Sequence, residues 1–212
     1  MNKPRIAIVD FGMNNLFSIY NGLEKAGSNP FITSNKDDIL LADGLVLPGV
    51  GAFNRAIEFL DENKLTDSIK AYANSGKYVL GICLGMQLLM DSSEEFGFHN
   101  GLGLIRGTCK KFNSNKLKVP HIMWNSLNII DHKNDLLNTQ NSKEMMYFIH
   151  SYYVNPDHKK SILSMTNYNG FEFCSAIQQN KVIGVQFHPE KSGIKGLEFL
   201  EKFIKKINYN DK

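Results

Sequence analysis

A change of sequence pattern at residue 83 constrains the fold of this chain more than any other feature. The apolar run Lys77–Ile82 predicts a buried strand, and Leu84–Met90 predicts the first turns of a helix. Gly81, Cys83 and Gly85 stand at the join with the spacing of G-x-S-x-G, so that cysteine takes the place of the nucleophile. In that motif the nucleophile occupies a tight strand-to-helix turn, where flanking glycines avoid a steric clash. The segment therefore predicts an α/β fold with a thiol at the carboxyl end of a buried strand.

Cys83 can be interpreted as a nucleophile or as a buried structural thiol. A helix amino terminus directly behind it favours negative charge, and therefore favours the reactive thiolate. Together with the two-glycine frame, this favours the nucleophile. Cys109 and Cys174 lie in strand-like segments and are expected to be inert packing residues. Three widely spaced cysteines predict neither a disulfide framework nor a metal site, and they fit a reducing, cytoplasmic setting.

A catalytic thiolate needs a base, and the second half of the chain supplies a candidate. The apolar segment Lys181–Phe187 predicts a buried strand that leads directly into His188, Pro189 and Glu190. Pro189 should end the strand, and in an extended backbone His188 and Glu190 point to the same side. The carboxylate would then hold one imidazole nitrogen while the other nitrogen faces the sulfur. The other five histidines are interpreted as ordinary core or surface residues.

The segments Gly81–Gln87 and Val185–Glu190 resemble the class I, or triad, glutamine amidotransferases. Five blocks occur in the order found in the glutaminase subunits of imidazole glycerol phosphate synthase and span nearly the whole chain: Ile8–Leu16, Leu47–Phe53, Val119–Asn125, Tyr147–Tyr153 and Phe187–Gly193. The resemblance implies hydrolysis of glutamine to glutamate and ammonia through a thioester on Cys83. It implies a catalytic triad of Cys83, His188 and Glu190, without a cofactor or a metal.

The tetrahedral intermediates of this reaction need N–H donors for their oxyanion. Leu84 is predicted to start a helix, so its amide is free to act as one donor. The loop Pro48–Gly51 is a candidate for the second donor, because glycines on both sides of Val50 let a peptide unit rotate. By itself this loop is more typical of a tight turn, but the resemblance implies an oxyanion strand with Val50 and Gly51 as its oxyanion residues. In related enzymes its active conformation forms only when the synthase is assembled and loaded.

Substrate glutamine needs a carboxylate for its ammonium group and N–H donors for its own carboxylate. Gln87 lies one helical turn after the cysteine and can reach the site. The resemblance implies that Glu95 binds the ammonium group, with neighbouring Glu94 as the alternative register. It implies further substrate contacts from Gly49, Ser151 and Tyr152. The ordinary alternatives are a surface amide for Gln87 and a solvated loop for the two glutamates.

Length and composition fit one domain. The chain has 212 residues, of which 42% are hydrophobic, and this predicts a single domain. The resemblance implies that this domain, residues 1–212, is a glutaminase. A net charge of +3 without a long run of one sign argues against nucleic acid or a membrane surface as the main partner. We expect no signal peptide, no membrane-spanning segment and a cytoplasmic location.

The order of predicted elements is typical of an α/β fold. In the first half, predicted strands alternate with predicted helices: strands Arg5–Phe11, Pro30–Thr33 and Gly44–Leu47, and helices Leu16–Ala26, Phe53–Leu60 and Leu65–Ser75, before the strand and helix around the cysteine. This predicts a mostly parallel open sheet flanked by helices, of the flavodoxin-like kind, with its ligand at the carboxyl ends of the strands. Short segments then predict an added antiparallel or mixed part: Leu117–His121, Leu127–Ile130, Met145–Val154, Ile162–Tyr168, Phe171–Ile177 and Val182–Phe187. A final helix is predicted over Ile194–Ile207.

The chain offers no second substrate domain, so ammonia is expected to pass to another protein. The resemblance implies a heterodimer with a (β/α)₈-barrel cyclase, in which ammonia and a phosphoribulosyl-formimino carboxamide ribonucleotide give imidazole glycerol phosphate and aminoimidazole carboxamide ribotide, in histidine biosynthesis. By the same analogy, the docking surface uses Asn14, Asn15, Met123, Trp124, Asn125 and Lys191. Trp124, the only tryptophan, suits an interface anchor, although composition alone is equally consistent with a core position.

Two of these positions depart from the family pattern. Asn14 and Met123 stand where the family usually has glycine. Asparagine tolerates a left-handed backbone, whereas Met123 adds a bulky side chain to the predicted interface. These departures leave open a related glutaminase subunit that supplies a sugar amidotransferase, which makes acetamidino sugars for surface glycans. A stand-alone glutaminase and a catalytically silent regulatory subunit are further alternatives, and the intact triad argues against the silent subunit.

Overall fold

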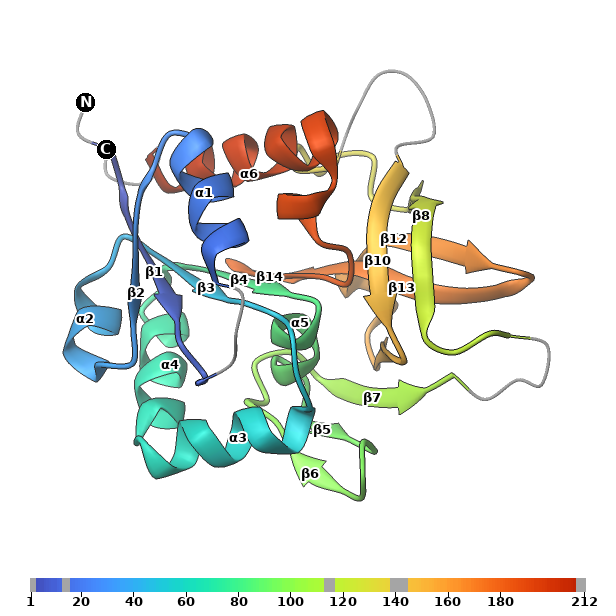
Figure 1. Cartoon of the computed structure of the whole chain (residues 1–212), viewed down its shortest axis with the longest axis horizontal. Coiled ribbons are helices and arrows are strands. Elements are labelled where there is room, and N and C mark those ends of the chain that lie inside the picture. Colours follow the sequence, from blue (N-terminus) through green and yellow to red (C-terminus); the bar gives the residue numbers. More distant parts are fainter. Residues whose placement is uncertain (1–2, 13–15, 113–116, 138–144, 209–212) are drawn as a thin grey trace.

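Five parallel strands form one side of a twelve-stranded sheet in the computed structural model, which describes residues 3–12, 16–112, 117–137 and 145–208 (Figure 1). Their order across the sheet is β2 (Asn29–Thr33), β1 (Arg5–Val9), β3 (Gly44–Leu47), β4 (Tyr78–Ile82) and β14 (Val182–Val185). Each neighbouring pair in this group is parallel. The structure thus confirms the predicted α/β fold with a mostly parallel sheet.

Helices cover both faces of this sheet. In Figure 1, α1 (Phe17–Lys25) and α6 (Gly193–Asn208) lie on one face, and α2 (Lys36–Leu41), α3 (Phe53–Glu62) and α4 (Leu65–Asn74) lie on the other. Successive strand residues enter opposite cores, so that Ile8 packs with α1 and α6 while Ala7 and Val9 pack with α3 and α4. Burial on both faces explains why these strands read as continuous apolar runs. Within the described ranges, no helix is long and apolar enough to cross a bilayer.

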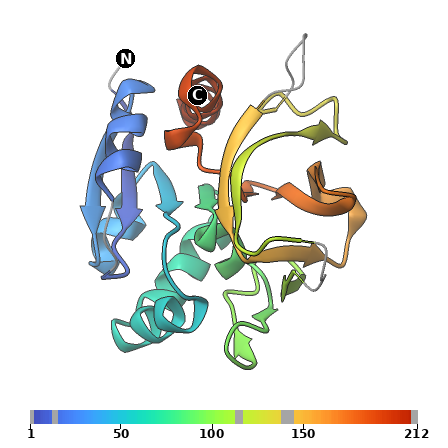
Figure 2. The same ribbon diagram turned by 45° about the vertical axis from the view of Figure 1, so that its right-hand side comes forward.

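The second half of the chain extends the sheet with strands that pair mostly antiparallel, and it adds a small separate sheet. The added strands are β5 (Ser92–Ser93), β6 (His99–Asn100), β7 (Gly107–Lys111), β9 (Asn128–Ile129), β11 (Tyr152–Pro156), β12 (Ile162–Tyr168) and β13 (Phe171–Gln179). The separate sheet consists of β8 (His121–Ser126) and β10 (Met145–His150), which pair in antiparallel register. Figure 2 shows this two-stranded layer beside the antiparallel end of the large sheet. The predicted antiparallel part is therefore present.

Helix α2 is missing from the sequence-based prediction. Its six residues are too few to show helical periodicity. The side-chain oxygen of Asn35 accepts a hydrogen bond from the N–H of Asp37 at 2.8 Å, and Asp37 and Asp38 occupy the first turn. This N-cap with acidic residues behind it is a start signal that the sequence does offer.

Two predicted strands differ from the observed structure in more than their end residues. The predicted strand Leu117–His121 is wrong, because β8 begins only at His121. Pro120 has no N–H for a ladder, and the carbonyl of Lys118 accepts a hydrogen bond from a tyrosine hydroxyl at 2.6 Å instead. The predicted strand Met145–Val154 divides at Ser151 into β10 and β11, which belong to different sheets.

The turn between β4 and α5 (Leu84–Leu88) touches the end of β3 backbone to backbone. A Cβ atom added to Gly85 would collide with the carbonyl oxygen of Leu47, and one on Gly49 would collide with the carbonyl oxygen of Ile82. A Cβ on Gly81 would lie 2.6 Å from the carbonyl carbon of Gly85. Three glycines therefore let β3, β4 and α5 approach closely at one end of the sheet.

We predict that Gly85→Ala destabilises the protein, because the new Cβ meets backbone atoms that cannot move aside. The expected loss in the free energy of unfolding is about 2–3 kcal/mol, measured by urea denaturation. Gly76→Ala is the matched control, since nothing lies within 4 Å of a Cβ there and only its φ of +77° is unfavourable. This control should lose about 1 kcal/mol. Equal losses in the two variants would contradict the role given to the close approach.

Candidate active site

Cys83 lies at the sharp turn between β4 and α5 in a rare backbone conformation. Its φ is +52° and its ψ is −104°, which is a strained combination for a residue with a side chain. The N–H of Cys83 donates to the carbonyl of Val185 at 2.7 Å, so that β14 holds the turn. The side chain is nearly buried, and its sulfur lies 3.7 Å from the carbonyl oxygen of Ile149. The turn thus has the shape that the glycine–cysteine–glycine spacing predicts.

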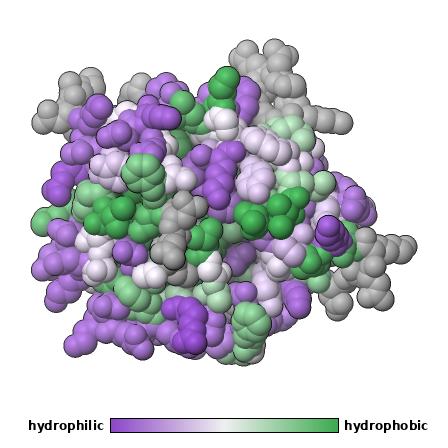
Figure 3. Space-filling model, viewed as in Figure 1, coloured by the Kyte–Doolittle hydropathy of each residue, from purple (hydrophilic) through white to green (hydrophobic). Residues whose placement is uncertain are grey.

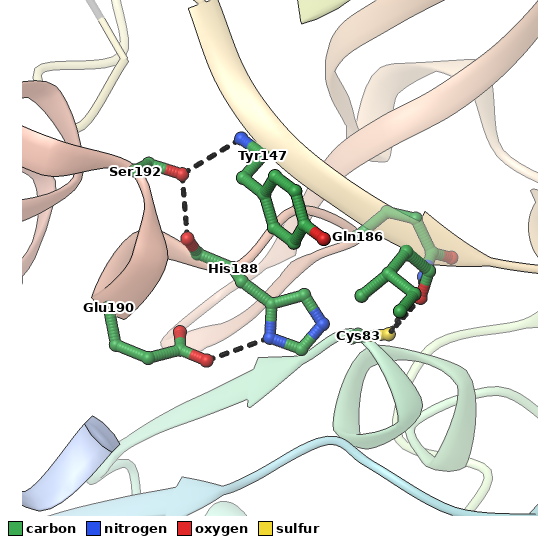
Figure 4. A network of polar contacts seen from close by, with 7 residues as sticks. Cys83, Tyr147, Gln186, His188, Glu190 and Ser192 are labelled. Carbon is green, nitrogen blue, oxygen red and sulfur yellow. Dashed lines mark hydrogen bonds and ion pairs between the residues drawn. The ribbon is translucent and has the colours of Figure 1, made fainter. Parts of the chain in front are cut away.

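His188 and Glu190 form a buried pair beside this turn. Nδ1 of His188 lies 2.7 Å from Oε1 of Glu190, and the two side chains are 1% and 7% exposed. Figure 4 shows the other imidazole nitrogen on the side of the ring that faces Cys83. This Nε2 is buried and has no hydrogen-bond partner among the described residues. The pair therefore has one nitrogen held by a carboxylate and one nitrogen available towards the sulfur.

The backbone that carries this pair differs from the prediction. Strand β14 ends at Val185 rather than at Phe187, and Pro189–Lys191 form a short 3₁₀ turn, η2, instead of continuing extended. The contact between His188 and Glu190 forms nevertheless, because the turn brings the two side chains together. The predicted contact between the two side chains is therefore observed, but the argument from an extended backbone is wrong.

Neighbouring segments clamp the backbone of His188. Its N–H donates to the carbonyl of Tyr147 at 2.9 Å, and its carbonyl accepts from the hydroxyl of Ser192 at 2.6 Å (Figure 4). The same hydroxyl accepts from the N–H of Tyr147 at 3.0 Å. Strand β10 and Ser192, the residue before α6, thereby fix the backbone that carries the imidazole.

The charges around His188 decide its protonation. Burial by itself lowers the pKa of His188, but the charge of a Cys83 thiolate and the Glu190 carboxylate outweigh burial and raise the pKa to about 10. His188 is therefore an imidazolium at neutral pH when the sulfur is ionised. In contrast, burial raises the pKa of the thiols of Cys109 and Cys174, which agrees with their predicted inert role.

A cleft of about 310 Å³ opens next to Cys83. Every predicted oxyanion and substrate residue lines it: Gly49, Val50, Gly51, Leu84, Gln87, Glu95, Ser151 and Tyr152. Pro120, Ile149 and His150 complete the wall. Four segments that are distant in sequence thus converge on one cavity at the carboxyl ends of β3 and β4, where parallel sheets bind ligands.

Two backbone groups near the sulfur suit the predicted oxyanion role. Leu84 is the first residue of α5, so its N–H has no acceptor within the helix. Gly49 packs closely against this amide, since a Cβ on Gly49 would lie 2.6 Å from the nitrogen of Leu84. Gly51 has a φ of +133°, a region open essentially to glycine. The loop after β3 therefore lies against Leu84 and has a glycine where a peptide can turn.

Gln87 is buried, so its interpretation as a surface amide is wrong. Its Nε2 donates to the carbonyl of Tyr152 at 3.1 Å and to Oε1 of Gln186 at 3.3 Å. Nε2 of Gln186 in turn lies 3.5 Å from the sulfur of Cys83. Sequence reasoning missed Gln186, although a glutamine inside the apolar run Lys181–Phe187 is a signal for a buried polar group with a purpose.

Glu94 and Glu95 differ in exposure and in their position relative to the cleft. Glu94 is exposed, whereas Glu95 is half-buried and lines the cleft. Oε2 of Glu95 accepts from the N–H of Phe53 at 2.8 Å, at the start of α3. Burial raises the pKa of the Glu95 carboxyl, while the Phe53 N–H and His99 oppose this. The carboxylate is thus already held in place at the edge of the cleft.

The predicted partner residues divide into exposed and partly buried ones. Met123 and Trp124 in β8 are 42% and 46% exposed, so a core position for Trp124 is wrong. Figure 3 shows apolar residues gathered where β8 and β10 lie. Asn125 is partly buried and donates to the carbonyl of a neighbouring strand, and Lys191 lies in η2 directly after Glu190. Asn14 and Asn15 lie outside the described residues.

No group of three or more His, Cys, Asp or Glu side chains in the described part of the chain could hold a metal ion. A strained thiol, a buried imidazole–carboxylate pair and free helix-start amides together suit nucleophilic attack on a carbonyl group.

Comparison with known sequences agrees with this arrangement. The sequence profile of the family Glutamine amidotransferase class-I matches residues 7–207. The imidazole glycerol phosphate synthase subunit HisH of Sulfurimonas denitrificans is 45% identical over 207 residues, which cover 96% of this chain and 99% of that protein. The subunit of the same name from Methanosarcina barkeri is 47% identical over 203 residues, with coverage of 94% and 98%.

Solved structures support the fold. A structure described as a glutamine amidotransferase has a TM-score of 0.75 at 14% identity and covers 96% of this chain and 98% of its own. PurLQS from Thermotoga maritima has a TM-score of 0.75 at 21% identity, with coverage of 99% and 100%. The family match over residues 7–207 and the two relatives at 45% and 47% identity lead to one conclusion: the chain belongs to the class-I glutamine amidotransferases and, within them, to the HisH family of imidazole glycerol phosphate synthase subunits.

Proposed function

We propose that this chain hydrolyses glutamine to glutamate and ammonia and passes the ammonia to a (β/α)₈-barrel cyclase subunit, which forms imidazole glycerol phosphate and aminoimidazole carboxamide ribotide in histidine biosynthesis. The observation that carries the proposal is the geometry at Cys83. A strained thiol faces a cleft lined by Gln87 and Glu95, with the buried pair of His188 and Glu190 behind it. The names of the close relatives support the same reaction and partner.

The proposed mechanism begins with the thiolate of Cys83. The sulfur attacks the amide carbon of glutamine, and the carbonyl electrons move to the oxygen, giving a tetrahedral oxyanion. Collapse of this species breaks the C–N bond, and Nε2–H of His188 gives its proton to the departing ammonia. A thioester remains. Water then attacks it, His188 takes a proton from that water, and the second collapse releases glutamate and restores the thiolate.

The remaining residues hold the reacting groups in place. Glu190 keeps His188 oriented through Nδ1 and stabilises its protonated form. The amide of Leu84 and a peptide N–H of the loop at Val50 and Gly51 would stabilise the oxyanion. Glu95 would bind the substrate ammonium, while Gln87 and the backbone of Gly49, Ser151 and Tyr152 would bind its other polar groups.

The proposed partner surface follows from the resemblance, and the exposure of Met123 and Trp124 supports it. It comprises Asn14, Asn15, Met123, Trp124, Asn125 and Lys191. The ring of Trp124 lies 6.0 Å from the ring of Tyr147, measured between centroids. Tyr147 belongs to β10, and its carbonyl accepts from the N–H of His188, so the exposed tryptophan contacts the strand that holds His188. We further propose that residues 1–212 act as one glutaminase domain in the cytoplasm, and the family match over residues 7–207 supports the single domain.

We predict that Cys83→Ala abolishes glutamine-dependent synthesis by the assembled enzyme but leaves ammonia-dependent synthesis largely intact. The thiolate is needed only to release ammonia, so added ammonium salt bypasses it. Cys174→Ala is the matched control, because this thiol is buried away from the cleft, and it should keep both activities. Both activities are measured as the rate at which imidazole glycerol phosphate forms. Equal loss of both in Cys83→Ala would show that the residue is structural.

We predict that His188→Asn lowers glutaminase turnover about 10²–10⁴-fold, because His188 transfers protons in both half-reactions. Glu190→Gln should lower turnover by a smaller factor, since Glu190 orients and stabilises without exchanging a proton itself. Turnover is measured as glutamate release under partner-stimulated conditions. Normal turnover in a folded His188→Asn variant would remove His188 from the mechanism.

We predict that the chain alone is a poor glutaminase and that a histidine-pathway cyclase with its bound ligand stimulates it strongly at low partner concentration. The physical switch is rotation of a peptide in the loop at Gly51 towards the cleft. Titrating the wild type and Met123→Gly with this cyclase tests the partner as well. If only Met123→Gly is stimulated, the wild type serves a different enzyme, and the sugar amidotransferase becomes the better candidate.

A further inference from the structure

A buried histidine pair lies outside the proposed catalytic triad. His121 and His150 are direct partners in the register of β8 and β10, and their side chains are 0% and 5% exposed. Nδ1 of His121 lies 2.9 Å from Nε2 of His150. The rings of Phe112, Phe148 and Phe173 surround the pair, with centroid distances of 5.0–6.5 Å. Burying two imidazoles among apolar rings costs free energy unless their nitrogens are hydrogen-bonded. The hydrogen bonds of the pair therefore need to be traced.

The acceptors in this cluster fix the tautomers of both rings. Nδ1 of His150 lies 2.7 Å from the carbonyl oxygen of Tyr152, which can only accept, so Nδ1 of His150 carries the proton. Burial lowers the pKa of His150 to about 3 and that of His121 to about 4, so both rings are neutral near pH 7. Nε2 of His150 is then an acceptor, and Nδ1–H of His121 must donate to it.

The hydrogen bonds therefore run in one direction. Nε2 of His121 is left as an acceptor and faces the Nδ2 group of Asn125 at 3.5 Å. The chain of donors passes from Asn125 through His121 and His150 to the carbonyl of Tyr152. It starts in the strand that carries Met123 and Trp124, and it ends at the turn where β10 leaves the small sheet for β11 in the large one.

The carbonyl of Tyr152 receives a second donor from the catalytic side. Nε2 of Gln87 donates to it at 3.1 Å, and Gln87 also contacts Gln186, whose amide reaches the sulfur of Cys83. One peptide group is thus held from two sides, by the histidine pair and by the amides that reach the thiol. Neighbouring Ser151 is held as well, since its carbonyl accepts from the N–H of Phe112 at 3.2 Å.

We propose that the His121–His150 pair is a positioning element that holds the turn at Ser151 and Tyr152 in the orientation that binds the glutamine backbone. This inference rests on the proposed glutaminase function. The pair does not touch the reacting atoms and transfers no proton. Without the N–H of His150, a partly buried carbonyl loses a hydrogen bond, and both the turn and the side chain of Gln87 gain alternative orientations.

Substitutions at His150 separate positioning from packing. His150→Leu removes the donor, whereas His150→Asn keeps an N–H donor near the place of Nδ1. We expect His150→Leu to raise the KM for glutamine about 10-fold, with a smaller change in kcat, because a lost buried hydrogen bond disorders a binding group. His150→Asn should recover most of the wild-type KM. Phe148→Leu is the packing control, since Phe148 is fully buried two residues earlier on the same face of β10.

Glutaminase kinetics are measured with the cyclase subunit and its ligand present, and amide hydrogen exchange is measured on the same variants. Exchange at the turn containing Ser151 and Tyr152 should rise in His150→Leu and stay near the wild type in His150→Asn and Phe148→Leu. If His150→Leu and Phe148→Leu change both readouts alike, the pair is ordinary core packing and the proposal is overturned.

Two further comparisons keep the test decisive. If His150→Leu does not fold, His121→Asn is compared with His121→Gln, because only asparagine places an amide N–H near the position of Nδ1. If His121→Asn keeps the KM for glutamine and the exchange rate at the turn near wild type while His121→Gln does not, the donor chain from Asn125 to the carbonyl of Tyr152 is supported. If the two variants behave alike, the proposal is overturned. If the wild type hydrolyses no glutamine, the proposed function fails, while hydrogen exchange at the turn still decides whether the pair positions it.

Discussion

The close backbone contact between β3, β4 and α5 is the constraint on which the rest of the site depends. Gly49, Gly81 and Gly85 allow this contact, because a Cβ at any of the three would meet backbone atoms. The contact lays the loop after β3 against the amide of Leu84 and forces Cys83 into its strained turn. Nucleophile and candidate oxyanion donors therefore share one rigid corner of the sheet, and rigidity of this kind is what preorganised catalysis needs.

Strand β10 joins this corner to the second half of the molecule. Its carbonyls at Tyr147 and Ile149 contact the backbone N–H of His188 and the sulfur of Cys83, and its last residue, His150, holds the carbonyl of Tyr152. One strand thus touches the base, the nucleophile and the cleft wall. Among the described strands β10 pairs only with β8, so these three contacts all depend on the small two-stranded sheet.

Sequence reasoning succeeded where the signal was local. The strand Gly44–Leu47 was predicted with its observed bounds. The contact between His188 and Glu190 was also predicted, although the backbone that makes it is a 3₁₀ turn and not the extended chain that was expected. It failed where the outcome depended on distant partners. The stretch before β8 is held by a tyrosine hydroxyl from β12, and the role of Gln186 appears only when Gln87 and the sulfur lie beside it. Neither contact has a trace in local periodicity.

By itself, the sequence determined the type of fold, the nucleophile turn and the identity of the candidate catalytic groups, because glycine spacing, apolar runs and short motifs act over a few residues. Tertiary structure alone decided that Glu95 rather than Glu94 faces the cleft, that Trp124 is on the surface, and that His121 and His150 meet. Those outcomes depend on how two sheets pack. A strand's pattern predicts which side chains share a face, but which face is covered, and by what, is decided only when distant segments come together.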